Sequence, residues 1–180
     1  MRSKILFFGL IAVFVFFTVW LAGIEPDGAL KEFVVRYGYF SFLAVAFLGG
    51  LNLIFPSIHL AFIVPLLNAG LELWVLVVLG AVGITLADGV GYGIGHSGGD
   101  VFGFLKRARN WGENFVAKYP RLTPLMIVGW ASFMPVPNEV FVIPAGLVRY
   151  GFWRTISFTF LGNLIFNIIA LNFGNLFVIL

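Results

Sequence analysis

The chain has 180 residues, of which 61% are hydrophobic and 11% are charged, with no cysteine and a net charge of +3. Soluble domains contain about 45–50% apolar and about 25% charged residues, so this composition predicts an integral membrane protein. The lack of cysteine excludes disulfides and cysteine metal sites. With two histidines and few acids we expect no metal or cofactor, and the small, scattered positive charge does not indicate a nucleic-acid partner.

The first apolar segment is residues 5–24, an uncharged run that follows Arg2 and Lys4. Its length matches the roughly 20 residues that a helix needs to cross a bilayer. A cleaved signal peptide is the alternative, but its apolar region has about 7–15 residues and ends at a small-residue cleavage site. We therefore predict a retained signal-anchor helix, followed by a polar connection at 25–36, so that residues 1–38 precede the main domain.

Residues 39–180 are expected to form an all-helical membrane domain. Within it, 40–70 carries no charge except on His59 and is interrupted by Pro56 and Pro65. Proline removes a backbone donor and clashes with the preceding turn. We therefore predict a re-entrant hairpin, with one helix to about residue 55 and a short returning piece over 59–68.

The next predicted elements are a spanning helix at 71–95 and a cytoplasmic amphipathic segment at 96–121. Small residues recur at every fourth position of the helix, which favours close packing against another helix: Gly83, Ala87, Gly91 and Gly95. Basic and aromatic residues alternate in the segment that follows, which is typical of a helix on the membrane surface.

Residues 122–148 are predicted to form a second hairpin, broken at Pro135, Pro137 and Pro144. Backbone freed by proline at membrane depth is tolerated only where it is buried in protein or lines a wet cavity. The final helix, 155–180, carries Asn163 and Asn167 one turn apart on one face, and we expect both amides to bond across helices.

The distribution of basic residues supports two returning hairpins. If both return, nine of the eleven Lys and Arg residues share one side with the N-terminus, which the positive-inside rule places in the cytoplasm. The second hairpin also repeats the first at a constant offset, with matching pairs Gly50/Gly129, Pro56/Pro135, Phe62/Phe141, Pro65/Pro144 and Trp74/Trp153. Two copies that enter from opposite sides form an inverted repeat, as in secondary transporters.

Three segments resemble the DedA family, also called the VTT or SNARE-associated family. They are PSIHLAFIVPLLNAG, LADGVGYGIGHSGG and FMPVPNEVFVIPAGLVRYGFWR, within about residues 40–175. The resemblance implies a multi-pass protein of the cytoplasmic membrane, not an enzyme, that moves lipids between leaflets as a flippase or scramblase. The lipid would be a polyprenyl-phosphate carrier or a phospholipid.

The sequence departs from the bacterial carriers of this family at the residues linked to proton coupling and phosphate binding. The expected acid of the first hairpin is replaced by Ser57, Ile58 and His59, and the two arginines of the second by Ser132 and Asn138. Proton coupling is therefore left open, and the chain resembles a divergent member.

The candidate substrate or proton pathway consists of Glu139, Asn138, Asp88, His59, Arg149 and Arg154. An ionisable group at membrane depth is costly, so Glu139 is either a pathway residue, a cap of its own helix or a partner of Arg149. Asn138 and His59 occupy equivalent places in the two hairpins and could face one cavity. The two arginines would guide a lipid phosphate or anchor the interface.

Two other functions and one open property accompany this prediction. A structural membrane protein would use the same polar groups to satisfy its own backbone. The run Gly95-His96-Ser97-Gly98 matches the short pattern of rhomboid-type serine proteases, although its serine lies at the edge of a polar loop. The sequence does not exclude a homo-oligomer.

Overall fold

The described residues, 28–51, 57–101, 105–134 and 137–178, form helices and the turns that join them, which confirms the all-α class in this computed structural model. The predicted signal anchor lies outside the described residues. The elements are α2 (Gly28–Gly50), the 3₁₀-helix η1 (Ile58–Phe62), α3 (Ile63–Asn68), α4 (Leu73–Val101), α5 (Leu105–Lys118), α6 (Leu122–Phe133), α7 (Glu139–Leu147) and α8 (Phe152–Val178).

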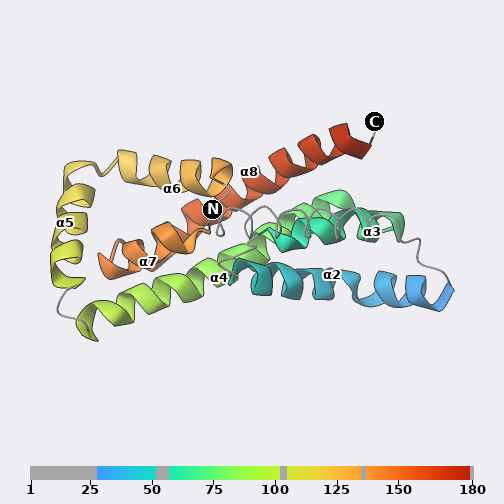
Figure 1. Ribbon diagram of the computed structural model, residues 1–180, viewed down its shortest axis with the longest axis horizontal. Coiled ribbons are helices and arrows are strands. Elements are labelled where there is room, and N and C mark those ends of the chain that lie inside the picture. Colours follow the sequence, from blue (N-terminus) through green and yellow to red (C-terminus); the bar gives the residue numbers. More distant parts are fainter. Residues whose placement is uncertain (1–27, 52–56, 102–104, 135–136, 179–180) are drawn as a thin grey trace, which may run out of the picture.

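The helices form an elongated bundle whose centre is made by α4 and α8, which run in opposite directions (Figure 1). The first hairpin is α2 with η1 and α3: α2 runs from one end to the middle, and the shorter arm returns to that end. The second hairpin is α6 with α7, and it enters the middle from the opposite end, which α5 closes. We call residues 57–59 the first tip and residues 137–139 the second tip.

The small-residue ladder of α4 is a packing surface, as predicted. Its first half lies against α2, where a Cβ on Gly83 would overlap Ala46. Its second half lies against α7, where a Cβ on Gly95 would overlap the backbone of Ile143 and one on Gly146 would overlap the backbone of α4. Glycine at both positions lets the two backbones touch.

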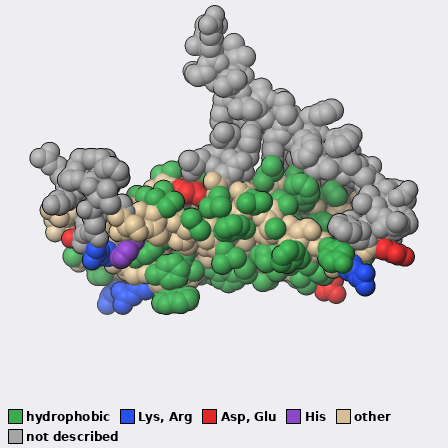
Figure 2. All heavy atoms as spheres, turned by 90° about the horizontal axis from the view of Figure 1, so that it is seen from below, with side chains coloured by type: hydrophobic (Ala, Val, Ile, Leu, Met, Phe, Trp, Pro, Cys, Tyr) green, Lys and Arg blue, Asp and Glu red, His purple; other side chains and the backbone are tan. Residues whose placement is uncertain are grey.

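Among the described residues, two helices are long and apolar enough to cross a membrane, Leu73–Ser97 in α4 and Phe152–Leu171 in α8. Apolar side chains also cover much of the outer surface: Phe40, Trp74, Leu125, Phe133 and Trp153 are each at least two-thirds exposed. Figure 2 shows hydrophobic side chains over the middle of one face, with most charged side chains near the two ends. An apolar surface this extensive is expected to meet lipid or another protein.

Several predicted boundaries are wrong because helices continue through polar residues. Helix α2 already begins at Gly28, so the boundary at 38/39 falls inside it, and it ends at Gly50, not near 55. No proline interrupts this stretch, and Lys31 and Glu32 are good helix formers. Helix α4 continues through Gly98 and Gly99 to Val101, because glycine weakens a helix without ending it. Helix α8 begins at Phe152, three residues before the predicted start.

The predicted proline breaks are partly wrong as well. Pro65 lies inside α3 and Pro144 inside α7, whereas Pro137 does precede α7. Pro65 is the third residue of α3, where an N–H would have no intrahelical acceptor anyway. Pro144 removes one helical hydrogen bond, but α7 continues to Leu147 because it is packed against α4. Pro56 and Pro135 lie outside the described residues.

Candidate functional site

The second tip is held to the two central helices by a cluster of polar side chains. The Asn138 amide donates to Asp88 Oδ2 over 3.2 Å and to Asn163 Oδ1 over 2.9 Å. The Asn163 amide donates to Asp88 Oδ2 over 2.9 Å and to Thr85 Oγ1 over 3.0 Å. Asp88 and Asn163 are 1% and 2% exposed and Asn138 is partly buried, so the part of the network between α4 and α8 is shielded from solvent.

The first tip is held in the same way, one helical turn further along α8. Buried His59 lies with its Nε2 3.1 Å from Asn167 Oδ1. The Asn167 amide donates to the Val77 carbonyl over 3.1 Å, so its oxygen accepts and His59 donates from Nε2. Gly80 provides the room, since a Cβ there would lie 2.8 Å from Asn167 Nδ2 and 3.3 Å from the His59 ring.

The two contacts are related by the repeat offset found in the sequence. His59 corresponds to Asn138 and Asp88 corresponds to Asn167, because 138 − 59 and 167 − 88 are both 79. His59 therefore binds α8 and Asn138 binds α4, at positions that share the same offset.

The returning arms also end in the same way. In both arms, three backbone N–H groups donate hydrogen bonds to carbonyls of the last helical turn, and the accepting residues match at the offset of 79. The residue after the cap has positive φ in both arms. In the first arm the donors are Ala69, Gly70 and Leu71; in the second they are Val148, Arg149 and Tyr150. Gly70 has φ 100° and Arg149 has φ 53°.

The predicted match of Gly50 with Gly129 is not supported by packing. A Cβ on Gly50 would meet Ala87 at 2.7 Å, whereas one on Gly129 would have no described atom within 4 Å. The entering arms instead match at an offset of 85, where Gly162 meets Ala131 as Gly83 meets Ala46. The stretch from Ala46 to His59 is six residues longer than the stretch from Ala131 to Asn138, which shifts the register of the entering arms.

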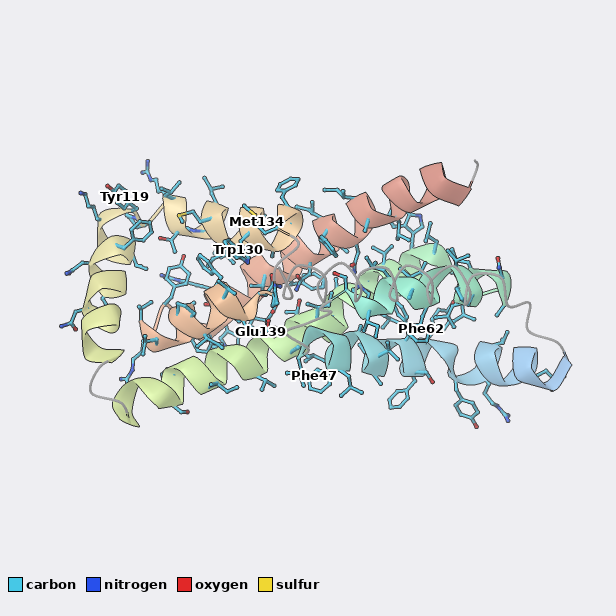
Figure 3. All side chains as sticks on the ribbon, viewed as in Figure 1. Phe47, Phe62, Tyr119, Trp130, Met134 and Glu139 are labelled. Atoms are coloured by element: carbon cyan, nitrogen blue, oxygen red, sulfur yellow. The ribbon has the colours of Figure 1, made fainter. Side chains whose placement is uncertain are left out.

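Glu139 begins α7 and is 9% exposed, as expected for a group at the second tip. A carboxylate in the first turn of α7 lies at the positive end of the helix dipole. The Oε1 atom has no hydrogen-bond partner among the described residues, and neither has Nε1 of Trp130, which points from α6 toward α7 (Figure 3). The buried hairpin thus offers one acceptor and one donor to a polar group.

The structure brings four of the six predicted site residues to the middle of the molecule, namely Asp88, Asn138, Glu139 and His59. The other two, Arg149 and Arg154, lie at the far end of α7 and the start of α8. Glu139 is the first residue of α7 and Arg149 lies two residues beyond its last, Leu147, so about 12 Å of helix lies between them, which disfavours the alternative in which Glu139 is a partner of Arg149.

Sequence reasoning missed Thr85, which is 7% exposed and bonded to Asn163. Thr85 lies three residues before Asp88 and therefore on the same face of α4, and this spacing could have identified it as a site residue. The prediction that Asn163 and Asn167 bond across helices is confirmed.

His59 of η1 does not lie near Ser97, the serine of the protease pattern. Ser97 is exposed near the end of α4, whereas His59 packs over Gly80. Seventeen residues of helix separate Gly80 from Ser97, about 25 Å. The structure therefore does not pair His59 with Ser97.

Two hollows adjoin these elements. An open apolar groove of about 540 Å³ lies between α4 and α8, and Thr85, Leu86, Val90, Trp153 and Phe160 are among its walls. A more enclosed cavity of about 240 Å³ lies where α5 meets the second hairpin, between Val116, Met126, Phe141, Val148 and Tyr150. Comparisons of the chain with protein-family models, curated proteins and solved structures found no match.

Proposed function

We propose that this chain is a multi-pass membrane protein of the DedA type that moves an amphipathic lipid between leaflets as a flippase or scramblase. The lipid is an isoprenoid phosphate or a phospholipid. The observation that carries the proposal is the pair of equivalent contacts, His59 with Asn167 and Asn138 with Asp88, midway along two helices of membrane-spanning length.

Re-entrant hairpins are supported by the length of their arms. Helix α6 has 12 residues and α7 has 9, whereas a helix needs about 20 to cross. In α2, only residues 37–50 follow the last charge. Arms of this length reach about halfway across the hydrocarbon core and return.

An inverted repeat is supported by features at both ends of the spanning helices. Trp74 and Trp153, a matching pair of the repeat, begin α4 and α8, are 67% and 77% exposed and lie at opposite ends of the molecule (Figure 1). Exposed tryptophan is typical of the membrane–water interface. Such a repeat brings the broken elements of both halves to the midplane, where transporters bind their substrates.

The chemistry of lipid movement follows from this arrangement. A headgroup crossing hydrocarbon loses its hydration, and fixed polar groups lower that cost by replacing water. The groove between α4 and α8 accommodates a lipid tail and reaches Thr85, which is bonded to the central network. Glu139 Oε1 and Trp130 Nε1 then offer an acceptor and a donor to the headgroup.

A purely structural role is the second candidate. It is favoured by the fact that Asn138, Asn163, Asp88 and Thr85 already bond to one another. A network that is satisfied internally rigidifies a core without any ligand.

Translocation in vesicles separates the two candidates. The full chain is reconstituted in phosphatidylcholine and phosphatidylglycerol vesicles that contain a fluorescent phospholipid or isoprenyl phosphate. A membrane-impermeant quencher then reports the labelled lipid that reaches the outer leaflet. We expect the parent to exceed empty vesicles, and Glu139→Gln to lower the rate because the amide replaces half of the acceptor capacity by donors.

The matched control is Glu72→Gln, which makes the same change at an exposed residue before α4 and should leave the rate unchanged. A parent rate equal to that of empty vesicles would end the transport proposal in favour of the structural one.

A further inference from the structure

The cavity of about 240 Å³ at the α5 end of the molecule lies beside an unusual backbone position. Arg149 is the non-glycine residue with positive φ in the described part of the chain, at 53°. Its equivalent in the first hairpin is Gly70, at 100°. Left-handed backbone costs a residue with a Cβ about 1–2 kcal/mol, so strain has been accepted here for an arginine side chain.

Arg149 stands between two residues that line this cavity, Val148 and Tyr150. The side chain of Arg154 is close as well, because its stem lies over Gly151, where a Cβ would meet it at 3.7–3.9 Å. Burial raises the pKa of the Tyr150 hydroxyl, and the charge of Arg154 acts in the opposite direction, which places the two side chains near each other. Both arginines are exposed, one on each side of the turn at Tyr150 and Gly151, and Tyr150 lines the cavity.

The cavity wall itself is apolar. Helix α5 contributes Phe115 and Val116, and its opposite face, with Asn110, Asn114 and Lys118, is exposed. The hydroxyl of Thr123, a polar group in the wall, already donates to the Tyr119 carbonyl. An apolar cavity of this kind excludes water and takes apolar ligands. Whole-ligand pockets measure about 300–1,000 Å³, so this one accommodates part of a single hydrocarbon chain.

The excess of basic over acidic side chains at this end favours an anionic ligand. Among the residues with described side chains, it carries four bases, Lys118, Arg121, Arg149 and Arg154, against one acid, Glu113. The opposite end carries Arg36 against Glu32 and Glu72. Arginine binds phosphate through a planar fork of donors.

We propose that this cavity is a binding site for one anionic phospholipid, with an acyl chain between α5 and the second hairpin and the phosphate at Arg149 and Arg154. The site lies away from the central network. It requires the chain to lie in a bilayer, as in the proposed function, but it requires no lipid movement.

Lipid retention tests the site directly. The full chain in detergent is exposed to equal amounts of dioleoyl phosphatidylglycerol and dioleoyl phosphatidylcholine, and bound lipid is counted by native mass spectrometry. We expect the parent to retain one phosphatidylglycerol in preference to phosphatidylcholine. Arg149→Gly and Arg154→Gln should each reduce this preference about fivefold, since one basic residue contributes about that factor near a lipid phosphate.

Arg149→Gly has a second readout that a structural arginine would not give. Because glycine suits positive φ, relief of the backbone cost should offset the lost side-chain contacts, so the melting temperature should stay close to that of the parent while the lipid preference falls. Arg36→Gln, an exposed charge at the opposite end, is the matched control and should change neither quantity.

The chain-binding part is tested by filling the cavity. Val116→Phe should remove the retained lipid, and Val140→Phe, the same change at an exposed position of α7 outside the cavity, should not. Equal retention of the two lipids by the parent, an unchanged preference in both arginine variants, or identical effects of the two valine variants would overturn the site. Since no translocation is measured, failure here leaves the transport proposal standing, and failure of transport leaves this site standing.

Discussion

The two hairpins have the same geometry and different chemistry. At the first tip an imidazole binds an amide, His59 with Asn167, and both groups can remain neutral. At the second tip an amide binds a carboxyl, Asn138 with Asp88, with Asn163 and Thr85 attached and a further carboxyl at Glu139. If the two halves descend from one repeat, one contact has kept a neutral pair and the other has acquired the acids.

The returning arms differ in how they are packed. The second arm touches α4 backbone to backbone at Gly95 and Gly146. The first arm packs through side chains, in a core cluster of Phe42, Ile63, Ala69, Leu71 and Leu76. Backbone contact leaves no room for adjustment, whereas side chains can change rotamer. The second hairpin is therefore expected to be the more rigidly positioned of the two.

The largest expected effect is the loss of stability when a side chain is added at the backbone contact between α7 and α4. Placing valine at Gly146 forces the backbones of α7 and α4 apart and should cost about 3 kcal/mol or more of unfolding free energy. Its equivalent in the first arm is Leu67, since 146 − 67 is 79. Leu67→Val removes about one methylene from a partly buried side chain and should cost about 1 kcal/mol. Unfolding in detergent, followed by circular dichroism, measures both.

A third valine variant serves as the control. A Cβ at Gly93 of α4 would have no described atom within 4 Å, so Gly93→Val should be nearly neutral. Comparable losses in Gly146→Val and Leu67→Val would contradict the asymmetry between the arms.

The sequence predicts the number and type of elements well because proline, glycine and long apolar runs are local signals. The register of the entering arms could not be predicted in the same way. It depends on the six residues by which the stretch from Ala46 to His59 exceeds the stretch from Ala131 to Asn138. Nothing in the Gly50/Gly129 match reports whether either glycine touches another helix. The extension of α4 to Val101 was missed because Gly98 and Gly99 weaken a helix without ending it.

The candidate site was predictable residue by residue but not as a constellation. Polar residues in apolar surroundings identified His59, Asp88, Asn138 and Glu139 as candidates. Their partners are set by how α8 crosses α4, which spacing along one chain does not specify. The same limit applies to Arg149, one of the alternatives weighed for Glu139, which lies beyond the other end of α7.

Removing the asparagine that each tip binds should have an intermediate effect on stability and compares the two tips directly. Asn163→Ala leaves Asp88, Asn138 and Thr85 each without one hydrogen bond in a buried site, and should cost about 2–3 kcal/mol. Asn167→Ala, one helical turn away, deprives only His59 and the Val77 carbonyl and should cost about 1–2 kcal/mol. Thermal unfolding of both variants in one detergent gives the order. A larger loss in Asn167→Ala would mean that the neutral contact, not the acidic one, is the main support of the centre.

The smallest effect concerns the caps, where the two arms share every hydrogen bond and differ in Gly70 and Arg149. A side chain at residue 70 would have no described atom within 4 Å, so any cost of substitution there comes from the backbone conformation alone. Gly70→Ala should therefore lower the unfolding free energy by about 1 kcal/mol, and Gly70→Asn by less, because asparagine tolerates positive φ better than alanine. Chemical unfolding resolves this ranking if the two variants are measured beside Asn68→Ala, an exposed residue at the end of α3. Were Gly70→Ala as stable as the parent, left-handed backbone would carry no strain at this cap, and Arg149 would need no functional reason to occupy the equivalent position.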